Sequence, residues 1–382
     1  METSLLQGQV RTRPPHKKSQ AFSGIHPVSK FGTQRFQTLP QPIGEPPYHI
    51  DLETIIPGIN AKSLQDEKIV FHTVGDTGGI KYAEYQTNVA AQMKTDLAAG
   101  GIIPSFFYQL GDVVYYNGEK SEYYSQFYEP YDHYSAPIIS IPGNHDGDPV
   151  PNSGQVSLDG WADYFMQKIP HIDPTSMDAP RVTLSLPNAY FTLLSPYVTI
   201  VGMYTNVPEH GSIDSDQQQW LTNELHTAPK DKALIVSLHH PIYSFDDHHS
   251  GSPKMADALQ HAINESRRVP NIVLTAHVHN YQRIEREIIK GGKSPFIVAG
   301  LGGYYHLHNL TANAGEKDSD TGAELIYGDD KNHGYLTLTV DKDNITGELT
   351  TIDKNNIVTQ KTDQFKYSAQ ALFLSNSDVI SL

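Results

Sequence analysis

The sequence predicts an α/β fold with a core rich in parallel strands. Beyond Lys68, short apolar runs that end in Gly, Asp, Asn or His alternate with amphipathic stretches. Strands that alternate with helices in this way are typical of a parallel-rich sheet. Five of the apolar runs end in clusters of polar residues, and in open α/β sheets the functional loops lie beyond the carboxyl ends of the strands. We therefore expect these clusters to meet in space, although they are far apart in the sequence.

The individual elements follow from the spacing of apolar residues and from residues that begin or end helices. Strands are expected over Lys68–Val74, Phe106–Leu110, Ile138–Ile141, Tyr190–Leu194, Val198–Met203, Ala233–Leu238 and Ile272–Thr275. Helices are expected over Ala83–Ala99, Ser215–His226 and Met255–Glu265. Gly100 and Gly101 end the first helix, and Asp214 or Ser215 caps the second.

The last part of the chain has a different pattern. Apolar and polar residues alternate over Gly334–Val340, Asn344–Thr351 and Ile357–Gln360, which predicts β-hairpins that could extend the core into a second sheet. Gly315–Asp330 is acidic and aperiodic, so we expect a loop there.

The expected organisation is one large domain with extensions at both ends. Residues 1–65 are broken by prolines and show no sustained period, which predicts an extended arm that is partly disordered at its start. Residues 66–370 form the main domain, including the C-terminal hairpins, and residues 371–382 form a tail.

Composition excludes several classes of protein. Apolar residues make up 38% of the 382 residues and charged residues 19%, which fits neither a disordered chain nor a membrane bundle. The net charge of −15 opposes binding to nucleic-acid backbones. The chain has no cysteine, so any metal must be held by His, Asp, Glu, Asn or Tyr.

The sequence gives little on location and assembly. No apolar run approaches the ~18 residues that a membrane-spanning helix needs, so no span is expected. The segment Met1–Arg11 lacks the apolar core of a signal peptide. The protein is expected to be cytoplasmic as it stands, or exported with a leader removed, and its oligomeric state is open.

The five polar clusters contain the residues that could carry chemistry. They are Gly75-Asp76-Thr77-Gly78, Gly111-Asp112-Val113-Val114-Tyr115, Gly143-Asn144-His145-Asp146, Val236-Ser237-Leu238-His239 and Ala276-His277-Val278-His279. Each cluster alone fits an ordinary turn or a buried histidine, but their joint occurrence after strand-like runs is much harder to explain in that way.

Together these blocks resemble the motifs of the calcineurin-like metallophosphoesterases, and specifically those of the purple acid phosphatase branch. The resemblance covers about Val70–Glu285, and the stretches Val278–Arg283 and Gln218–Leu221 add to it. Ala276 stands where the family usually has glycine, which should only tighten a turn. The resemblance implies a four-layer sandwich of two mixed β-sheets flanked by helices, here with an extended N-terminal arm.

By resemblance, the chain would hydrolyse phosphate monoesters at a dinuclear metal centre. A pair of ions ~3.5–4 Å apart brings phosphate and hydroxide together, so that metal-bound hydroxide attacks phosphorus. The first ion would take Asp76, Asp112, Tyr115 and His279, and the second would take Asp112, Asn144, His239 and His277. Asp112 would bridge the two ions.

Ligand charge indicates which ions fit such a centre. Asp76, Asp112 and a phenolate Tyr115 supply three negative charges, so a trivalent and a divalent ion together leave a surplus of two positive charges. A phenolate favours Fe(III) over zinc or magnesium. We therefore expect Fe(III) at the Tyr115 site and Fe(II), Zn or Mn at the second.

Four further residues are candidates for catalysis. The resemblance implies that His145 points at the phosphate and that Asp146 orients its ring. His248 and His249 are expected to line the substrate pocket and to assist the leaving group, although their acidic loop also fits a solvated turn. We expect His240 to lie behind the metal ligands, whereas nothing in the sequence assigns a role to the nearby pair His306 and His308.

Two alternatives to the monoesterase stay open. One is a phosphodiesterase or nucleotidase with the same centre, because selectivity depends on loops with no transferable code. The other is a non-catalytic scaffold with the same fold, which is disfavoured because all seven ligand positions carry the expected residue types.

Overall fold

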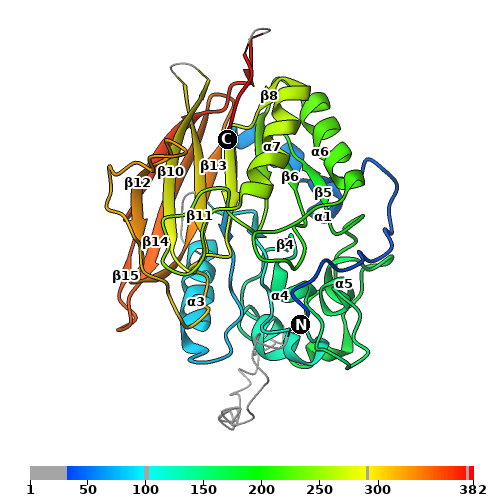
Figure 1. Ribbon diagram of the computed structural model, residues 1–382. Coiled ribbons are helices and arrows are strands. Elements are labelled where there is room, and N and C mark those ends of the chain that lie inside the picture. The colour runs from blue at the N-terminus through cyan, green and yellow to red at the C-terminus, as the bar shows by residue number, and fades with distance from the viewer. Residues whose placement is uncertain (1–31, 99–102, 290–291, 376–377) are drawn as a thin grey trace, which may run out of the picture.

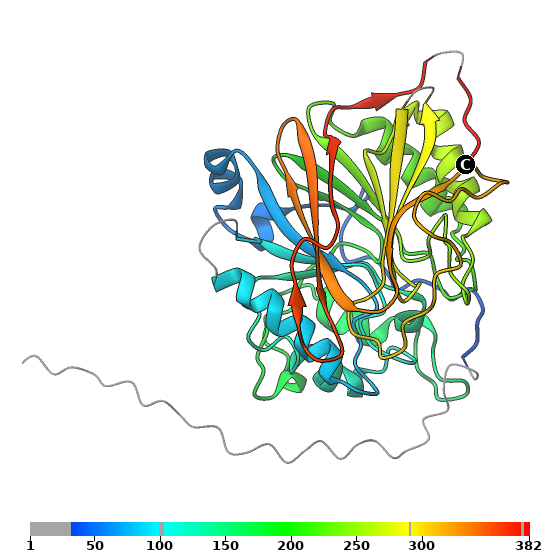
Figure 2. The ribbon, with the colours of Figure 1, turned by 90° about the vertical axis from the view of Figure 1, so that its left-hand side faces the viewer.

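The fold is a sandwich of four layers, in which two β-sheets pack face to face and helices cover their outer faces (Figures 1 and 2). A computed structural model of the chain describes residues 32–98, 103–289, 292–375 and 378–382. The predicted fold class is confirmed.

The structure gives the following bounds. The strands are β1 (His49–Asp51), β2 (Ile69–Val74), β3 (Phe106–Gln109), β4 (Ile138–Ser140), β5 (Phe191–Leu194), β6 (Val198–Gly202), β7 (Ala233–Ser237), β8 (Arg268–Val269), β9 (Ile272–Thr275), β10 (Tyr281–Ile289), β11 (Gly292–Ala299), β12 (Glu324–Asp329), β13 (His333–Val340), β14 (Asn344–Ile352), β15 (Val358–Thr359), β16 (Gln364–Ser368) and β17 (Leu372–Phe373). The helices are α1 (Leu52–Ile55), α2 (Ile59–Asp66), α3 (Glu84–Ala98), α4 (Asn144–Gly147), α5 (Asp159–Phe165), α6 (Ser215–Thr227) and α7 (Pro253–Ser266). Short helical turns are η2 (Lys120–Glu122), η3 (Tyr124–Tyr128) and η4 (Pro174–Ser176).

Each sheet contains a run of neighbouring parallel strands. One sheet has the order β1-β5-β6-β7-β9-β11-β10-β12, with β6, β7, β9 and β11 parallel. The other has the order β15-β14-β13-β2-β3-β4, with β2, β3 and β4 parallel and β16 beside β14. The predicted hairpin strands extend the core in this second sheet, because β13 pairs antiparallel with both β2 and β14.

The core has two layers of apolar side chains, because the central strands are buried on both faces. In β7, Ile235 packs between the two sheets, whereas its neighbours Leu234 and Val236 pack under α6 and α7. These two helices lie side by side over the first sheet, and α3 packs against the second (Figure 1). Asp214 caps α6 by accepting a hydrogen bond from the backbone N–H of Gln217 at 2.8 Å.

Two features of the sheets differ from the sequence predictions. The segment expected as a loop over Gly315–Asp330 contains β12, which pairs with β10. The hairpin of β10 and β11 was also not predicted, and it extends the parallel part of its sheet with antiparallel strands. β12 is an edge strand and β10 is only partly buried, so both carry a weak hydrophobic pattern.

The described part of the N-terminal arm packs along the main domain. The side chain and backbone N–H of Thr33 donate hydrogen bonds to Asp148, and Gln37 exchanges hydrogen bonds with Asn206. β1 pairs with β5, and α1 and α2 follow it, so the predicted arm contains regular structure from residue 49 onward. The expected disorder falls on residues outside those described. The boundaries proposed at residues 65 and 370 stay predictions.

None of the helices in the described ranges combines the length and the apolar character that crossing a membrane would require.

A buried histidine between the second sheet and α3 makes stability depend on pH. Burial lowers the pKa of His72 below its usual 6.5, although Asp96 at 3.3 Å partly opposes this effect. Between that lowered value and about pH 6.5, the unfolded chain binds a proton that the folded chain does not, so the free energy of unfolding falls as pH falls. One such group contributes up to about 1.4 kcal/mol per pH unit.

We expect His72→Gln, which cannot titrate, to make this loss of stability on acidification shallower than in the wild type. Unfolding midpoints measured across this pH range would test this. The exposed His226, replaced by Gln, should leave the slope unchanged, and an unchanged slope in His72→Gln would contradict the assignment.

Candidate metal centre

Five loops from both sheets bring the predicted ligands together. Asp76, Asp112 and Asn144 lie just beyond β2, β3 and β4 of one sheet, whereas His239, His277 and His279 lie beyond β7 and β9 of the other. The two groups are joined directly, because the backbone N–H of His277 donates to Asp76 Oδ2 at 2.8 Å. The site therefore lies where the carboxyl ends of strands from two sheets meet.

The first group of side chains consists of Asp76, Tyr115 and His279. The Tyr115 hydroxyl donates to Asp76 Oδ1 at 2.9 Å and lies 3.3 Å from His279 Nε2. His279 Nε2 is also 3.4 Å from Asp76 Oδ1. Three potential ligand atoms thus face one another.

The second group consists of Asp112, Asn144, His239 and His277. Asn144 Oδ1 lies 3.1 Å from His239 Nε2 and 2.9 Å from His277 Nδ1. Asp112 Oδ2 lies 3.3 Å from His239 Nε2. Ligand atoms of Asp112, His239 and His277 lie within 4.8 Å of one another, as a shared ion requires.

Backbone carbonyls set which imidazole nitrogen faces the centre. His239 donates from Nδ1 to the carbonyl of Leu110 at 2.8 Å, and His279 donates from Nδ1 to the carbonyl of His306 at 3.1 Å. Each therefore directs the lone pair of Nε2 inward, which is the usual arrangement behind a metal-binding histidine. His277 is turned the other way, with Nδ1 toward Asn144 and Nε2 4.0 Å from Glu209.

Three of the proposed ligands have a backbone conformation that is unusual for residues other than glycine. Asp76, Asp112 and His277 have φ of 54°, 54° and 67°, a left-handed conformation that non-glycine residues rarely adopt and that clusters at functional sites. Two glycines permit the close approach of these turns. A Cβ on Gly111, where φ is 96°, would lie 2.6 Å from His239 Nδ1, and one on Gly143 would lie 2.1 Å from Asp112 Oδ1.

Ala276, the departure from the family motif, is accommodated by its neighbour. A Cβ on Gly75 would lie only 2.4 Å from the Cβ of Ala276. Because Gly75 has no side chain, the alanine methyl group is buried without displacing the turn that carries His277 and His279.

The protonation of the two histidines beside Asp112 shows how a cation would fit the site. Burial alone would lower the pKa of His239, but the Asp112 carboxylate outweighs it and raises this pKa to about 9. Burial lowers the pKa of His277 well below its usual value, so this ring stays neutral and able to bind a cation. Asp112 Oδ2 and His277 Nε2 are buried without a hydrogen bond. Without a metal ion, the proton on His239 is the charge that faces the Asp112 carboxylate. A metal ion can take the place of that proton, so these residues fit a metal ion.

His145 borders this centre with one ring nitrogen free. Its Nδ1 donates to the carbonyl of Tyr116 at 2.8 Å, and its backbone N–H donates to Asp112 Oδ1 at 2.9 Å. The ring packs against Tyr115 with centroids 4.7 Å apart. Nε2 of His145 is therefore the atom that a substrate can meet.

The expectation that Asp146 orients the His145 ring is wrong. The Asp146 carboxylate accepts hydrogen bonds from the backbone N–H groups of Val113, Val114 and Gly143, at 2.8–3.2 Å. Burial and the nearby Asp112 charge raise its pKa to about 7. Asp146 instead fixes the loop after β3 against the loop after β4, and Tyr116 orients the His145 ring.

His248 and His249 occupy different positions. His249 faces the centre, because its ring lies 4.4 Å from that of His277, and its Nδ1 lies 3.1 Å from Glu209. The His248 side chain is 47% exposed and stacks on His308 with centroids 4.3 Å apart, so its expected part in catalysis stays a prediction. His240 lies behind the ligands, buried, with Nδ1 2.7 Å from Thr205 Oγ1.

Sequence reasoning missed two residues at this site. Glu209 follows β6 and contacts His249, but it stands in a loop without a motif. The Tyr304 ring lies 4.3 Å from His279 and 4.4 Å from Tyr115. It follows Gly302 and Gly303, a turn signal that marks a loop but not its chemistry.

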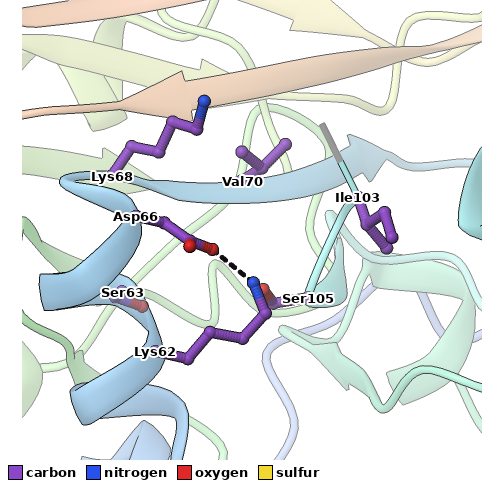
Figure 3. A pocket seen from close by; sticks show the side chains of 7 residues that line it. All are labelled: Lys62, Ser63, Asp66, Lys68, Val70, Ile103 and Ser105. Atoms are coloured by element: carbon purple, nitrogen blue, oxygen red, sulfur yellow. Dashed lines mark hydrogen bonds and ion pairs between the residues drawn. The ribbon is translucent and has the colours of Figure 1, made fainter. Parts of the chain in front are cut away.

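A separate hollow of about 210 Å³ lies at the opposite edge of the second sheet, by the amino ends of β2 and β3 (Figure 3). An ion pair between Lys62 and Asp66 lies along it. None of the predicted site residues lines this hollow.

Comparison with known proteins gives this geometry a context. A family model described as calcineurin-like phosphoesterase matches residues 49–281, which is more than half of the chain. The purple acid phosphatase PPD1 from seeds of yellow lupin (Lupinus luteus) is 18% identical, with a TM-score of 0.55, over 79% of this chain and 54% of that chain. The chain thus spans about half the length of the lupin protein.

Two other solved structures share the fold. GAP50, the anchor in the inner membrane complex of Plasmodium, is 13% identical, with a TM-score of 0.56, over 79% of this chain and 89% of that chain. PhoD is 13% identical, with a TM-score of 0.50, over 90% of this chain and 74% of that chain. Identities this low show the fold alone. The family model carries the assignment: the chain belongs to the calcineurin-like phosphoesterase family.

Proposed function

We propose that the chain hydrolyses phosphate monoesters at a dinuclear metal centre and is most active in mildly acidic solution. The observation that supports this proposal is the buried group of Asp112, His239 and His277, whose ligand atoms lie within 4.8 Å of one another, together with the second group formed by Asp76, Tyr115 and His279. Family membership supports phosphoester hydrolysis. The preference for monoesters rests on the resemblance to purple acid phosphatases.

The two groups of contacting side chains correspond to the two proposed ion positions. One ion would be held by Asp76, Tyr115 and His279, a second by Asn144, His239 and His277, and both by Asp112. Because Asp112 Oδ1 already accepts the backbone N–H of His145, Oδ2 is the oxygen open to cations. We propose Fe(III) beside Tyr115, since phenolate is a hard and strongly donating ligand, and Fe(II), Zn or Mn at the second position.

A pair of such ions supplies the positive charge that draws a phosphate group and a nucleophilic water together and lowers the pKa of that water. The surrounding side chains position the ester. His145 presents Nε2 toward the phosphate and, when protonated, stabilises negative charge that develops on it. His249 is the nearer candidate for proton donation to the leaving alcohol, because the Glu209 carboxylate outweighs burial and raises the pKa of His249.

A substrate comparison tests this proposal. We expect turnover of p-nitrophenyl phosphate by the protein loaded with two equivalents of metal, and a much lower kcat/KM for bis(p-nitrophenyl) phosphate. The reverse preference would identify a diesterase with the same centre. An intact pair of ions with no turnover of either ester would favour a non-catalytic scaffold.

A further inference from the structure

Three imidazoles meet at the edge of the centre, apart from the seven proposed ligands. His248 comes from the loop after β7, whereas His306 and His308 come from the loop after β11. One ring nitrogen of each lies within 4.8 Å of the other two. The His306 ring centroid is 5.6 Å from that of His248 and 5.5 Å from that of His308. The proposed hydrolysis assigns no role to His306 or His308.

Carboxylates orient two of the three rings. His308 donates from Nδ1 to Asp246 at 3.2 Å, and His248 donates from Nδ1 to Asp247 at 2.6 Å. This leaves the lone pair of Nε2 available on each ring, which is how metal-binding histidines are usually held.

The two carboxylates are themselves fixed. Asp246 accepts hydrogen bonds from the backbone N–H groups of His248 and His249 and from the side chain of Asn280. Asp247 accepts hydrogen bonds from the side chain and backbone N–H of Asn309. Hydrogen bonds therefore hold Asp246 and Asp247 in place behind the imidazoles, and those of Asp247 connect the loop after β7 to the loop after β11.

We propose that His248, His306 and His308 bind a third cation of the Zn²⁺, Ni²⁺ or Cu²⁺ class. Three imidazoles without a thiolate, and with carboxylates only behind them, favour these ions over Mg²⁺, Ca²⁺ or Mn²⁺. Three protein ligands also leave a coordination position open.

Binding requires one local movement. The rings of His248 and His308 are stacked, only 15° from parallel, so their lone pairs do not yet point at a common position. His308 is buried, but the His248 side chain is 47% exposed and its partner Asp247 is 35% exposed. His248 can therefore turn out of the stack toward the exposed His306.

A cation at this position would lie beside the dinuclear centre, because the His308 ring is 4.5 Å from that of His279. It would also hold the loop that carries His249 against the loop after β11. We therefore expect the third ion to inhibit hydrolysis.

Metal stoichiometry tests the inference on the full chain, prepared without a histidine tag and loaded with the two ions of the centre. His306→Ala is the informative variant, because the His306 backbone carbonyl, and not its side chain, holds His279. In equilibrium dialysis against Zn²⁺, the wild type should bind one equivalent more than His306→Ala. The exposed His261 on α7, replaced by Ala, is the matched control and should keep the extra equivalent.

Equal Zn²⁺ stoichiometry in wild type and His306→Ala would overturn the inference. With Cu²⁺ as the probe, nitrogen couplings in the electron paramagnetic resonance spectrum should be present in the wild type and reduced in His306→Ala. Inhibition by added Zn²⁺ should likewise be weaker in the variant. If the chain proved not to be a hydrolase, the difference of one equivalent would still be measurable, so the two proposals fail separately.

Discussion

Replacing Asp112 by alanine is expected to remove both metal ions and to lower kcat/KM by more than about a thousandfold. Asp112 Oδ2 is buried, lies 3.3 Å from His239 Nε2 and has no hydrogen bond. Its charge is the only one that both proposed ion positions share. Metal ions stabilise phosphoryl-transfer transition states by several kcal/mol, and each 1.36 kcal/mol corresponds to about tenfold in rate.

Two further variants make this result interpretable. Asp112→Asn keeps an oxygen that can accept the backbone N–H of His145, so it tests the charge with little change of shape. Asp96→Asn removes a carboxylate from the network of His72 and Tyr335, away from the centre. It should lower the unfolding midpoint but retain both ions. Elemental analysis and kcat/KM would be measured on all three proteins, and one retained ion with substantial turnover in Asp112→Ala would refute the bridging role.

Tyr115→Phe is expected to abolish a visible charge-transfer band and to weaken binding of Fe(III), while the fold stays intact. The Tyr115 hydroxyl contacts both Asp76 and His279, so a ferric ion held by these two side chains also meets the phenol oxygen. Burial and then the Asp76 charge raise the pKa of Tyr115 well above its usual value. The phenolate therefore forms only when a strongly charged cation replaces the proton, so loading with Fe(III) should release a proton.

Tyr116→Phe is the matched control, because this neighbouring ring is only half-buried and its side chain is not a proposed ligand. It should keep the band. Absorbance spectra and iron content of wild type and both variants would be compared after loading with two equivalents of iron. A wild-type protein that holds two irons without a visible band would exclude the purple acid phosphatase branch, although not membership of the wider family.

The parts of the fold that the sequence predicts best are the buried strands that are followed directly by polar residues. β2, β3, β7 and β9 are mainly apolar and fully buried, and each ends within three residues of a proposed ligand. At these points an apolar segment changes abruptly into a polar loop, so both the strand and the polar residues at its carboxyl end can be located from the sequence. By contrast, β12 lies within an acidic segment and is stabilised by pairing with β10, which local pattern does not encode.

The candidate site shows the same limit. Asp76, Asp112 and His239 stand at recognisable strand ends, whereas Glu209 reaches His249 only because two loops meet in three dimensions. Asp146 illustrates a second limit. Its place beside His145 in the sequence suggested a contact between side chains, but the turn directs its carboxylate to three backbone N–H groups instead. Sequence adjacency does not determine the direction of a side chain within a tight turn.

The division of the proposed ligands between two sheets has a consequence for the order of folding and metal binding. Asp76, Asp112 and Asn144 depend on one sheet, and His239, His277 and His279 depend on the other. Neither group alone contains all the proposed ligands, so we expect high-affinity metal binding to require that the two sheets are packed together. Bound ions would then hold the two sheets together. Removing them with a chelator should weaken the contact between the sheets before it unfolds either sheet.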